Sequence, residues 1–397
     1  MMKVFDYSFQ YENTTTGRVN LWLAHPPETD RQTVLAEERA EAETYSDEIG
    51  NRFSYHELAP GEKVEASYTV GLETVAGKQA SLTAEERERY TRSTAMIPVN
   101  EEIRRMAGDL TAEAENDREK GRLLFLHLVA DYTYKFPVRA RGVEHFLKEK
   151  KGDCGEYSFL YASLCRALGI PCRVMVGAFA MGKHHAHVWN ELYVEGEGWI
   201  PVDTSMAYTV KKQLWRFFFT SIRTLKWRRY FGETENQRIV FSIDTEHEPV
   251  PSYPEEDLEG RPYETFPLAD KDFTWGKSAL HGRIPYFQPM YFHYEADRPY
   301  KWKRTEEALG SWRVKEGSTG RGFLATRTIA GYLALFLAFI YFLTSWEIAS
   351  ILFPFPAFLY CLSFCVRKER TVFFSLASSF FGAVSILVML GFLAEYV

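Results

Sequence analysis

The sequence predicts an α+β fold that ends in transmembrane helices. Apolar and polar residues alternate along the first 80 residues, as in half-buried strands, and a helical apolar pattern follows Cys154. Three long apolar runs close the chain. We therefore divide the 397 residues into an N-terminal β domain (1–80), a central domain (81–295), a linker (296–327) and a membrane domain (328–397).

The N-terminal pattern is typical of a small β-sandwich. Phe5, Tyr7, Phe9 and Tyr11 alternate with polar neighbours, and similar alternation recurs before residue 75. The turn-forming residues Asn13–Gly17 predict the loop of a first hairpin. Such a domain either supports the rest of the chain structurally or selects a substrate, and the sequence leaves both interpretations open.

Cys154 is expected at the start of a helix. Gly169 and Pro171 predict where this helix stops. The unpaired amides and the dipole at a helix N-terminus favour an anion, so we expect a lowered thiol pKa and a nucleophilic cysteine. The alternative is a buried structural cysteine. The apolar positions that recur at helical spacing are Phe159, Leu160, Ala162, Leu164, Ala167 and Leu168.

A histidine and an aspartate follow on a predicted hairpin. Residues 187–194 are typical of a strand, residues 195–198 of a turn, and the chain returns through Trp199 to Asp203. A hairpin of this length can bring the carboxylate of Asp203 to the imidazole of His187, which would fix its tautomer. The neighbouring residues His184 and His185 are competing candidates.

Three segments together resemble the transglutaminase-like superfamily, which includes transglutaminases, cysteine peptidases and peptide deglycosylating enzymes. They are Gly152-Asp153-Cys154-Gly155-Glu156-Tyr157, then His187-Val188-Trp189-Asn190-Glu191, then Trp199-Ile200-Pro201-Val202-Asp203. The resemblance is good over roughly residues 100–205 and selects His187 among the three histidines. It implies a papain/transglutaminase-like core in which a helix with Cys154 packs on an antiparallel sheet with His187 and Asp203.

The resemblance also implies an enzyme with a Cys154–His187–Asp203 triad. Such an enzyme forms a thioester acyl-enzyme from an amide of a peptide or protein substrate. Water resolves the thioester in a peptidase or amidase, and an amine resolves it in a transglutaminase; we favour hydrolysis because it requires less of the site. The oxyanion would be bound by the Cys154 amide and by a side chain, for which Tyr134 is a candidate. The alternative is a catalytically silent binding scaffold at the membrane.

Composition limits the partners, metals and cofactors that we expect. The net charge of −6 gives no sign of a nucleic-acid partner, and we expect none. The five cysteines lack zinc-site spacing, so we expect neither a metal nor a cofactor. Their odd number favours reduced thiols and a reducing compartment. Protein partners other than a substrate stay unknown.

One stretch of the central domain is basic and aromatic. Residues 211–229 contain seven Lys or Arg residues and no acid, with tryptophan and phenylalanine interleaved. Such a helix can lie on an anionic membrane surface. It can equally pack its aromatic side on the domain with the basic residues in solvent.

The C-terminal runs predict a multi-pass membrane protein that contacts the lipid bilayer. They cover residues 328–345, 348–366 and 372–394, of which the last is long enough to span and the first two are near the lower limit. Pro354 and Pro356 interrupt the second run, so the first two runs either span or re-enter as a hairpin.

The basic residues around these runs predict the orientation. Basic clusters precede the first run and follow the second, whereas the turn between them has neither Lys nor Arg. Because such residues remain on the cytoplasmic side, we expect residues 1–322 in the cytoplasm and Val397 outside. The basic residues are Arg313, Lys315, Arg321, Arg327, Arg367, Lys368 and Arg370.

Overall fold

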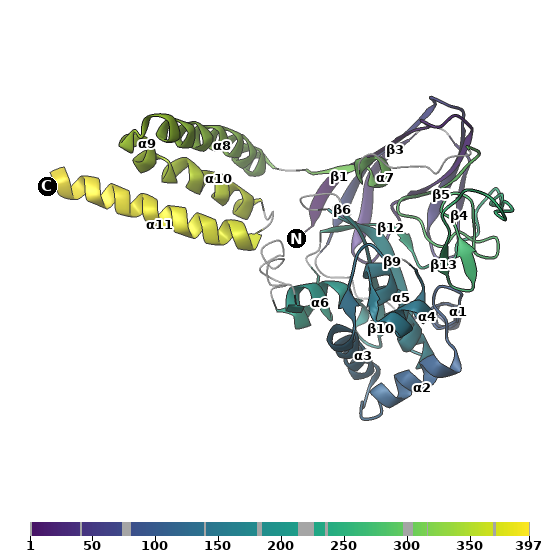
Figure 1. Cartoon of the computed structure of the whole chain (residues 1–397). Helices are drawn as coiled ribbons and strands as arrows, with labels where there is room; N and C mark the ends of the chain where they lie inside the picture. The colour runs from purple at the N-terminus through teal and green to yellow at the C-terminus, as the bar shows by residue number, and fades with distance from the viewer. Residues whose placement is uncertain are drawn as a thin grey trace. The chain divides into compact units, whose positions relative to one another are not determined.

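The computed structural model consists of two compact units. One comprises residues 1–211 and 227–314, and the other residues 212–226 and 315–397 (Figure 1). The model describes residues 2–39, 42–73, 81–138, 140–180, 185–212, 226–234, 237–296, 305–315, 317–367 and 371–396. Most of the basic, aromatic segment therefore lies outside the described residues.

The N-terminal residues form a sandwich of two four-stranded sheets, in the orders β16-β1-β6-β3 and β15-β2-β5-β4. The alternating aromatics Phe5, Tyr7, Phe9 and Tyr11 are all buried. The elements are β1 (Lys3–Glu12), β2 (Val19–His25), β3 (Gln32–Arg39), β4 (Thr44–Ser46), β5 (Arg52–Leu58), β6 (Lys63–Leu72), β15 (Met290–Tyr294) and β16 (Ser311–Val314).

The predicted hairpin at Asn13–Gly17 is wrong. β1 and β2 lie in different sheets, so this loop connects the two layers of the sandwich. The cause is the buried Asn13, whose Nδ2 donates to the carbonyl of Leu58 at 2.9 Å and to that of Gly17 at 2.8 Å. These bonds tie the loop to the end of β5 and turn the chain away from its own strand.

Two strands from late in the chain complete the sandwich. β15 pairs antiparallel with β2, and β16 pairs antiparallel with β1. Their residues fall in the ranges 81–295 and 296–327 that the sequence assigned to the central domain and the linker. Those domain limits stay a prediction, and the structure adds that strands from both ends of the first unit pair in the same two sheets.

The centre of this unit is an antiparallel sheet in the order β11-β10-β9-β12, packed against helix α5. The predicted α+β class is confirmed. The elements are α1 (Ala84–Arg89), α2 (Glu101–Leu110), α3 (Asp117–Asp131), β7 (Thr133–Tyr134), α4 (Val143–Glu149), β8 (Lys151–Gly152), α5 (Cys154–Ala167), β9 (Cys172–Phe179), β10 (His185–Val194), β11 (Gly198–Val202), α6 (Thr204–Lys212), a 3₁₀ turn (Trp227–Tyr230), β12 (Arg238–Ile243), β13 (Phe266–Leu268) and β14 (Lys271–Phe273).

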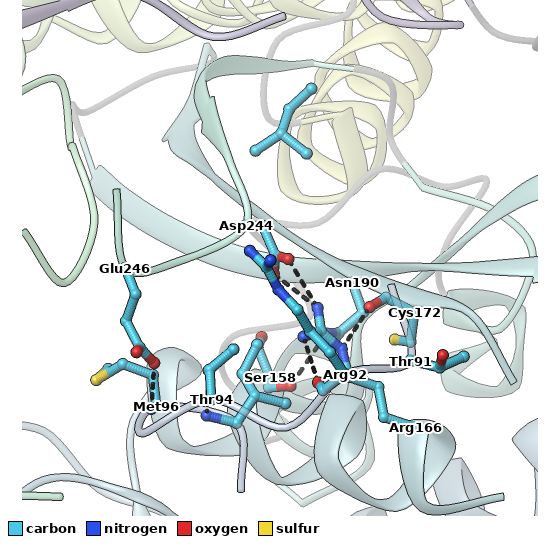
Figure 2. Close-up of polar contacts among 12 residues, drawn as sticks. Thr91, Arg92, Thr94, Met96, Ser158, Arg166, Cys172, Asn190, Asp244 and Glu246 are labelled. Carbon is cyan, nitrogen blue, oxygen red and sulfur yellow. Dashed lines mark hydrogen bonds and ion pairs between the residues drawn. The ribbon is translucent and has the colours of Figure 1, made fainter. Parts of the chain in front are cut away.

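Arg166, in the last turn of α5, fastens this helix to its surroundings. Its buried guanidinium donates to both carboxylate oxygens of Asp244, at 2.8 and 2.9 Å, and to the carbonyls of Arg92 and Cys172 (Figure 2). Asp244 directly follows β12, and Cys172 begins β9. One side chain thus joins the helix to two strands of the sheet and to the loop after α1.

The free edge of the central sheet is covered by side-chain amides from the sandwich. Gln32 accepts from the amide of Val240 at 2.8 Å and donates to its carbonyl at 3.0 Å. Asn51 pairs with Ile243 in the same way, at 2.8 and 2.9 Å. Because an open strand edge leaves backbone groups unpaired, these two amides replace a neighbouring strand for β12.

The second unit contains the apolar helices α8 (Ser318–Thr344), α9 (Glu347–Leu352), α10 (Pro354–Val366) and α11 (Thr371–Tyr396). Within the described residues, three helical segments are long and apolar enough to cross a membrane: 318–344, 347–366 and 372–391. Glycines allow close packing between them, since Gly331 of α8 faces Tyr360 and Gly382 of α11 faces Phe358.

Candidate active site

Cys154 begins α5, as the sequence predicts, and a capping box fixes its position. The Asp153 side chain accepts from the amide of Gly155 at 2.8 Å, and the Glu156 side chain accepts from the amide of Asp153 at 3.2 Å. Arg141 donates to both carboxylates, at 2.9 Å to Asp153 and 3.3 Å to Glu156. The first turn of the helix is therefore held by one cation shared between two acids.

The two acids of this cap differ in the direction of their pKa shifts. Burial and the charge of Asp153 raise the pKa of Glu156 to about 8. Burial would also raise the pKa of Asp153, but Arg141 and the hydrogen bonds to Glu156 and Gly155 lower it. Close to the thiol, the cap thus presents Asp153 as the charged acid.

The turn before Cys154 is set by a short parallel pairing. Tyr134 of β7 lies opposite Gly152 of β8. A side chain at Gly152 would collide with Phe146 and Glu156, at 2.7 Å from each, so this position needs a glycine. Tyr134 is partly buried in the core, and its role at an oxyanion stays a prediction.

The structure brings His187 and Asp203 together. His187 Nε2 lies 2.6 Å from Asp203 Oδ2, and both side chains are buried. Asp203 Oδ1 accepts from the Ser205 hydroxyl at 2.9 Å and from the Met206 amide at 2.8 Å, which fixes the carboxylate. Of the competing histidines, His185 is exposed and His184 lies outside the described residues.

Cys154 lies beside the same strand. The amide of Val188, which directly follows His187, donates to the thiol sulfur. Cys154 therefore approaches β10 next to the histidine that the sequence selects. The elements that carry the two residues are also joined behind the site, where Asn190 Nδ2 of β10 donates to the Ser158 carbonyl of α5 at 3.0 Å (Figure 2).

The expectation of a lowered thiol pKa at this helix N-terminus is wrong. Burial and the charge of Asp153 raise the pKa of Cys154 well above its usual range, and the hydrogen bond from Val188 only partly offsets them. Asp203 and Glu156 act in the same direction as Asp153. Burial is the largest of these causes, and the neighbouring acids add to it.

The pKa of Asp203 is shifted in the opposite direction from that of Cys154. Burial would raise the pKa of Asp203, but the neighbouring His187 and the guanidinium of Arg238 outweigh burial and hold that pKa well below its usual range. Arg238 Nη1 lies 2.6 Å from the same Oδ2 that meets His187. The sequence analysis missed Arg238, because a single arginine at the start of a strand carries no motif.

A family model matches the part of the chain that contains these residues. Residues 104–204 match the model described as Transglutaminase-like superfamily. These residues form a transglutaminase-like domain. The match includes Cys154, His187 and Asp203 and ends one residue after the aspartate. The resemblance proposed from the three sequence segments is thus confirmed for this part of the chain.

Curated relatives match the transglutaminase-like domain over short stretches. The chain is 37% identical over 68 residues to the peptide-N(4)-(N-acetyl-beta-glucosaminyl)asparagine amidase of Drosophila melanogaster, covering 17% of this chain and 10% of that protein. It is 34% identical over 92 residues to a protein-glutamine gamma-glutamyltransferase of Pseudomonas aeruginosa, covering 20% and 14%. The chain thus spans only about a tenth to a seventh of these relatives.

Solved structures are also similar. A proposed cysteine protease from Cytophaga hutchinsonii is 16% identical, with a TM-score of 0.46 over 79% of this chain and 98% of that one. The periplasmic domain of TgpA from Pseudomonas aeruginosa is 18% identical, with a TM-score of 0.36 over 52% and 77%. Taken together, the family match and the relatives support an enzyme function, and the apolar helices suggest membrane association.

Proposed function

We propose that this protein is a membrane-anchored cysteine enzyme that forms a thioester from an amide of a peptide or protein substrate. The observation that carries the proposal is the 2.6 Å contact between His187 Nε2 and Asp203 Oδ2, beside a thiol that opens α5. Since Nε2 is engaged by the carboxylate, Nδ1 is the ring nitrogen that exchanges a proton with Cys154.

The chemistry starts from the Cys154 thiol and the His187 imidazole. Cys154 Sγ attacks the amide carbon while its proton passes to His187, and Asp203 stabilises the resulting imidazolium. When the tetrahedral intermediate collapses, the C–N bond breaks and the amine leaves with that proton. Water then attacks the thioester, His187 takes a proton from it, and the acid and the free thiol are released.

An amine in place of water would make the reaction a transamidation. The two outcomes share the acyl-enzyme and differ in the access of water and amine to it. We favour hydrolysis because it requires no second binding site. A peptide library incubated with the purified full chain, with and without a primary amine, separates the two by the mass of the products.

The acyl-enzyme itself is the direct test. The full chain in detergent is mixed with the library, quenched in acid and digested, and the Cys154 peptide is examined by mass spectrometry. We expect a thioester adduct on Cys154 that is absent in Cys154→Ala and strongly reduced in His187→Ala. Peptide turnover that persists in Cys154→Ala would overturn the proposal.

A silent scaffold is the second candidate, because burial and acidic neighbours raise the pKa of Cys154. It predicts that Cys154→Ala leaves the cellular role of the protein intact.

For the membrane unit, we propose that the basic residues flanking its helices keep residues 1–322 in the cytoplasm.

A further inference from the structure

Phe136 is an exposed aromatic residue in the transglutaminase-like domain. Its exposed fraction is 70%, the largest value of any large apolar side chain among the described residues of the first unit. Pro137, the next residue, is exposed as well and extends the apolar surface. Single exposed apolar side chains are common on proteins, so exposure alone assigns no role to Phe136. The position of the loop that carries it is more informative.

This loop, residues 135–141, is fixed at both ends to the turn that precedes the nucleophile. At its start, the amide of Lys135 donates to the carbonyl of Gly152 at 2.8 Å. At its end, Arg141 Nη2 donates to Asp153 Oδ2 at 2.9 Å. Gly152 and Asp153 are the two residues directly before the nucleophilic cysteine. The loop is therefore held beside the place where a substrate amide must lie.

The same contacts limit the distance between Phe136 and Cys154. Phe136 directly follows Lys135, and Cys154 is two residues after Gly152. With about 3.8 Å between consecutive Cα atoms and about 5 Å across the backbone contact, the Cα atoms of Phe136 and Cys154 lie at most about 16 Å apart. An extended peptide rises about 3.3 Å per residue, so this distance corresponds to about five residues of a bound substrate.

We propose that Phe136 is a specificity-determining residue that contacts a large apolar side chain of the peptide substrate, within about five residues of the amide that Cys154 attacks. The inference deepens the proposed function and rests on it. Removing water from the Phe136 ring and from an apolar partner is favourable, and an aromatic partner gains further from the ring contact. The preferred substrate residues are therefore phenylalanine, tyrosine, leucine and methionine.

The test is a library of short blocked peptides, varied at every position and incubated with the full chain in detergent. Mass spectrometry of the thioester on Cys154 and of the products gives the preferred residue at each position relative to the reacting amide. For the wild type, we expect a preference for large apolar residues at a position near the amide. Phe136→Ala should lose this preference and lower kcat/KM for the preferred peptides about tenfold or more, chiefly by raising KM.

Further variants separate specificity from a structural role. Phe136→Leu should retain most of the preference, because it keeps an apolar side chain. Phe136→Glu should shift the preference toward lysine and arginine, because a carboxylate attracts cationic side chains. The matched control is Leu35→Ala, which truncates an apolar side chain on β3 that is 47% exposed. It should keep the wild-type peptide profile.

An unchanged peptide profile in Phe136→Ala would overturn the inference. An equal loss for all peptides would also overturn it, because this would indicate a structural role. An unchanged profile together with an altered oligomeric state would assign Phe136 to a contact between two copies of the chain instead. Failure of the proposed function looks different: no peptide would then leave a thioester on Cys154 in the wild type, and the inference would fall with it.

Discussion

Asn190 on the histidine strand donates to the carbonyl of Ser158 on the cysteine helix at 3.0 Å. Both groups are buried; Asn190 lies three residues from His187 along the strand, and Ser158 lies four residues from Cys154 along the helix. A displacement of about 1 Å between reacting groups is enough to lower a rate a hundredfold. This contact therefore bears directly on the geometry of the site.

Asn190→Ala should loosen the helix from the strand. Losing a buried hydrogen bond and leaving a small cavity costs about 1–3 kcal/mol of folding free energy. We expect a lower denaturation midpoint together with slower alkylation of Cys154. Asn116→Ala, which removes the N-cap of α3, is the control: it should cost about 1 kcal/mol but leave the alkylation rate unchanged. Equal alkylation rates in both variants would contradict this role of Asn190.

Alkylation of Cys154 should be slow at neutral pH. Burial and the charge of Asp153 raise the pKa of the thiol, so we expect it to react more slowly than free glutathione at pH 7 and faster as the pH rises. His187→Ala should slow it further, because the proton then lacks an acceptor. Cys165 and Cys172 are fully buried and should label only after unfolding, which provides the internal reference.

Asp203→Asn should destabilise the fold in a pH-dependent manner. A carboxyl whose pKa is lower in the folded protein stabilises it at pH values above its unfolded pKa of about 3.9, and this is lost as the pH falls toward the folded value. Removing one partner of a buried ion pair costs about 3–5 kcal/mol. The difference in denaturation midpoint between variant and wild type should be large at pH 7 and shrink only below about pH 4. If the difference in denaturation midpoint stayed constant across this pH range, the lowered pKa of Asp203 would not be the cause.

Gln32→Ala should weaken the contact between the sandwich and β12. The change leaves the amide and carbonyl of Val240 without their side-chain partner. An unsatisfied buried polar group costs about 1–3 kcal/mol of folding free energy. Because Val240 lies two residues from Arg238, the alkylation profile of Cys154 should change as well. The control is Lys63→Ala, which removes an exposed ion pair with Glu12. It should cost less than about 1 kcal/mol of folding free energy.

The proposed orientation can be tested on intact cells. A protease added outside should leave the N-terminal 322 residues whole, and should digest them only after the membrane is permeabilised. An epitope tag fused after Val397 should be accessible from outside. Digestion of residues 1–322 in intact cells would contradict the charge argument.

The sequence by itself determined the helix that begins at Cys154, the strand with His187 and the return to Asp203, because each depends on local periodicity and turn residues. The apolar helices could be predicted as well, because their length and composition are enough to identify them. Spacing also predicted the contact of His187 with Asp203, since a short hairpin allows few registers.

Only the tertiary structure decided the rest. Arg238 reaches Asp203 because β12 pairs with β9, a contact between segments about 60 residues apart that no local pattern encodes. The sandwich closes with β15 and β16 for the same reason. The pKa of Cys154 is raised mainly by burial, which only the fold provides and which the argument from the helix N-terminus did not include.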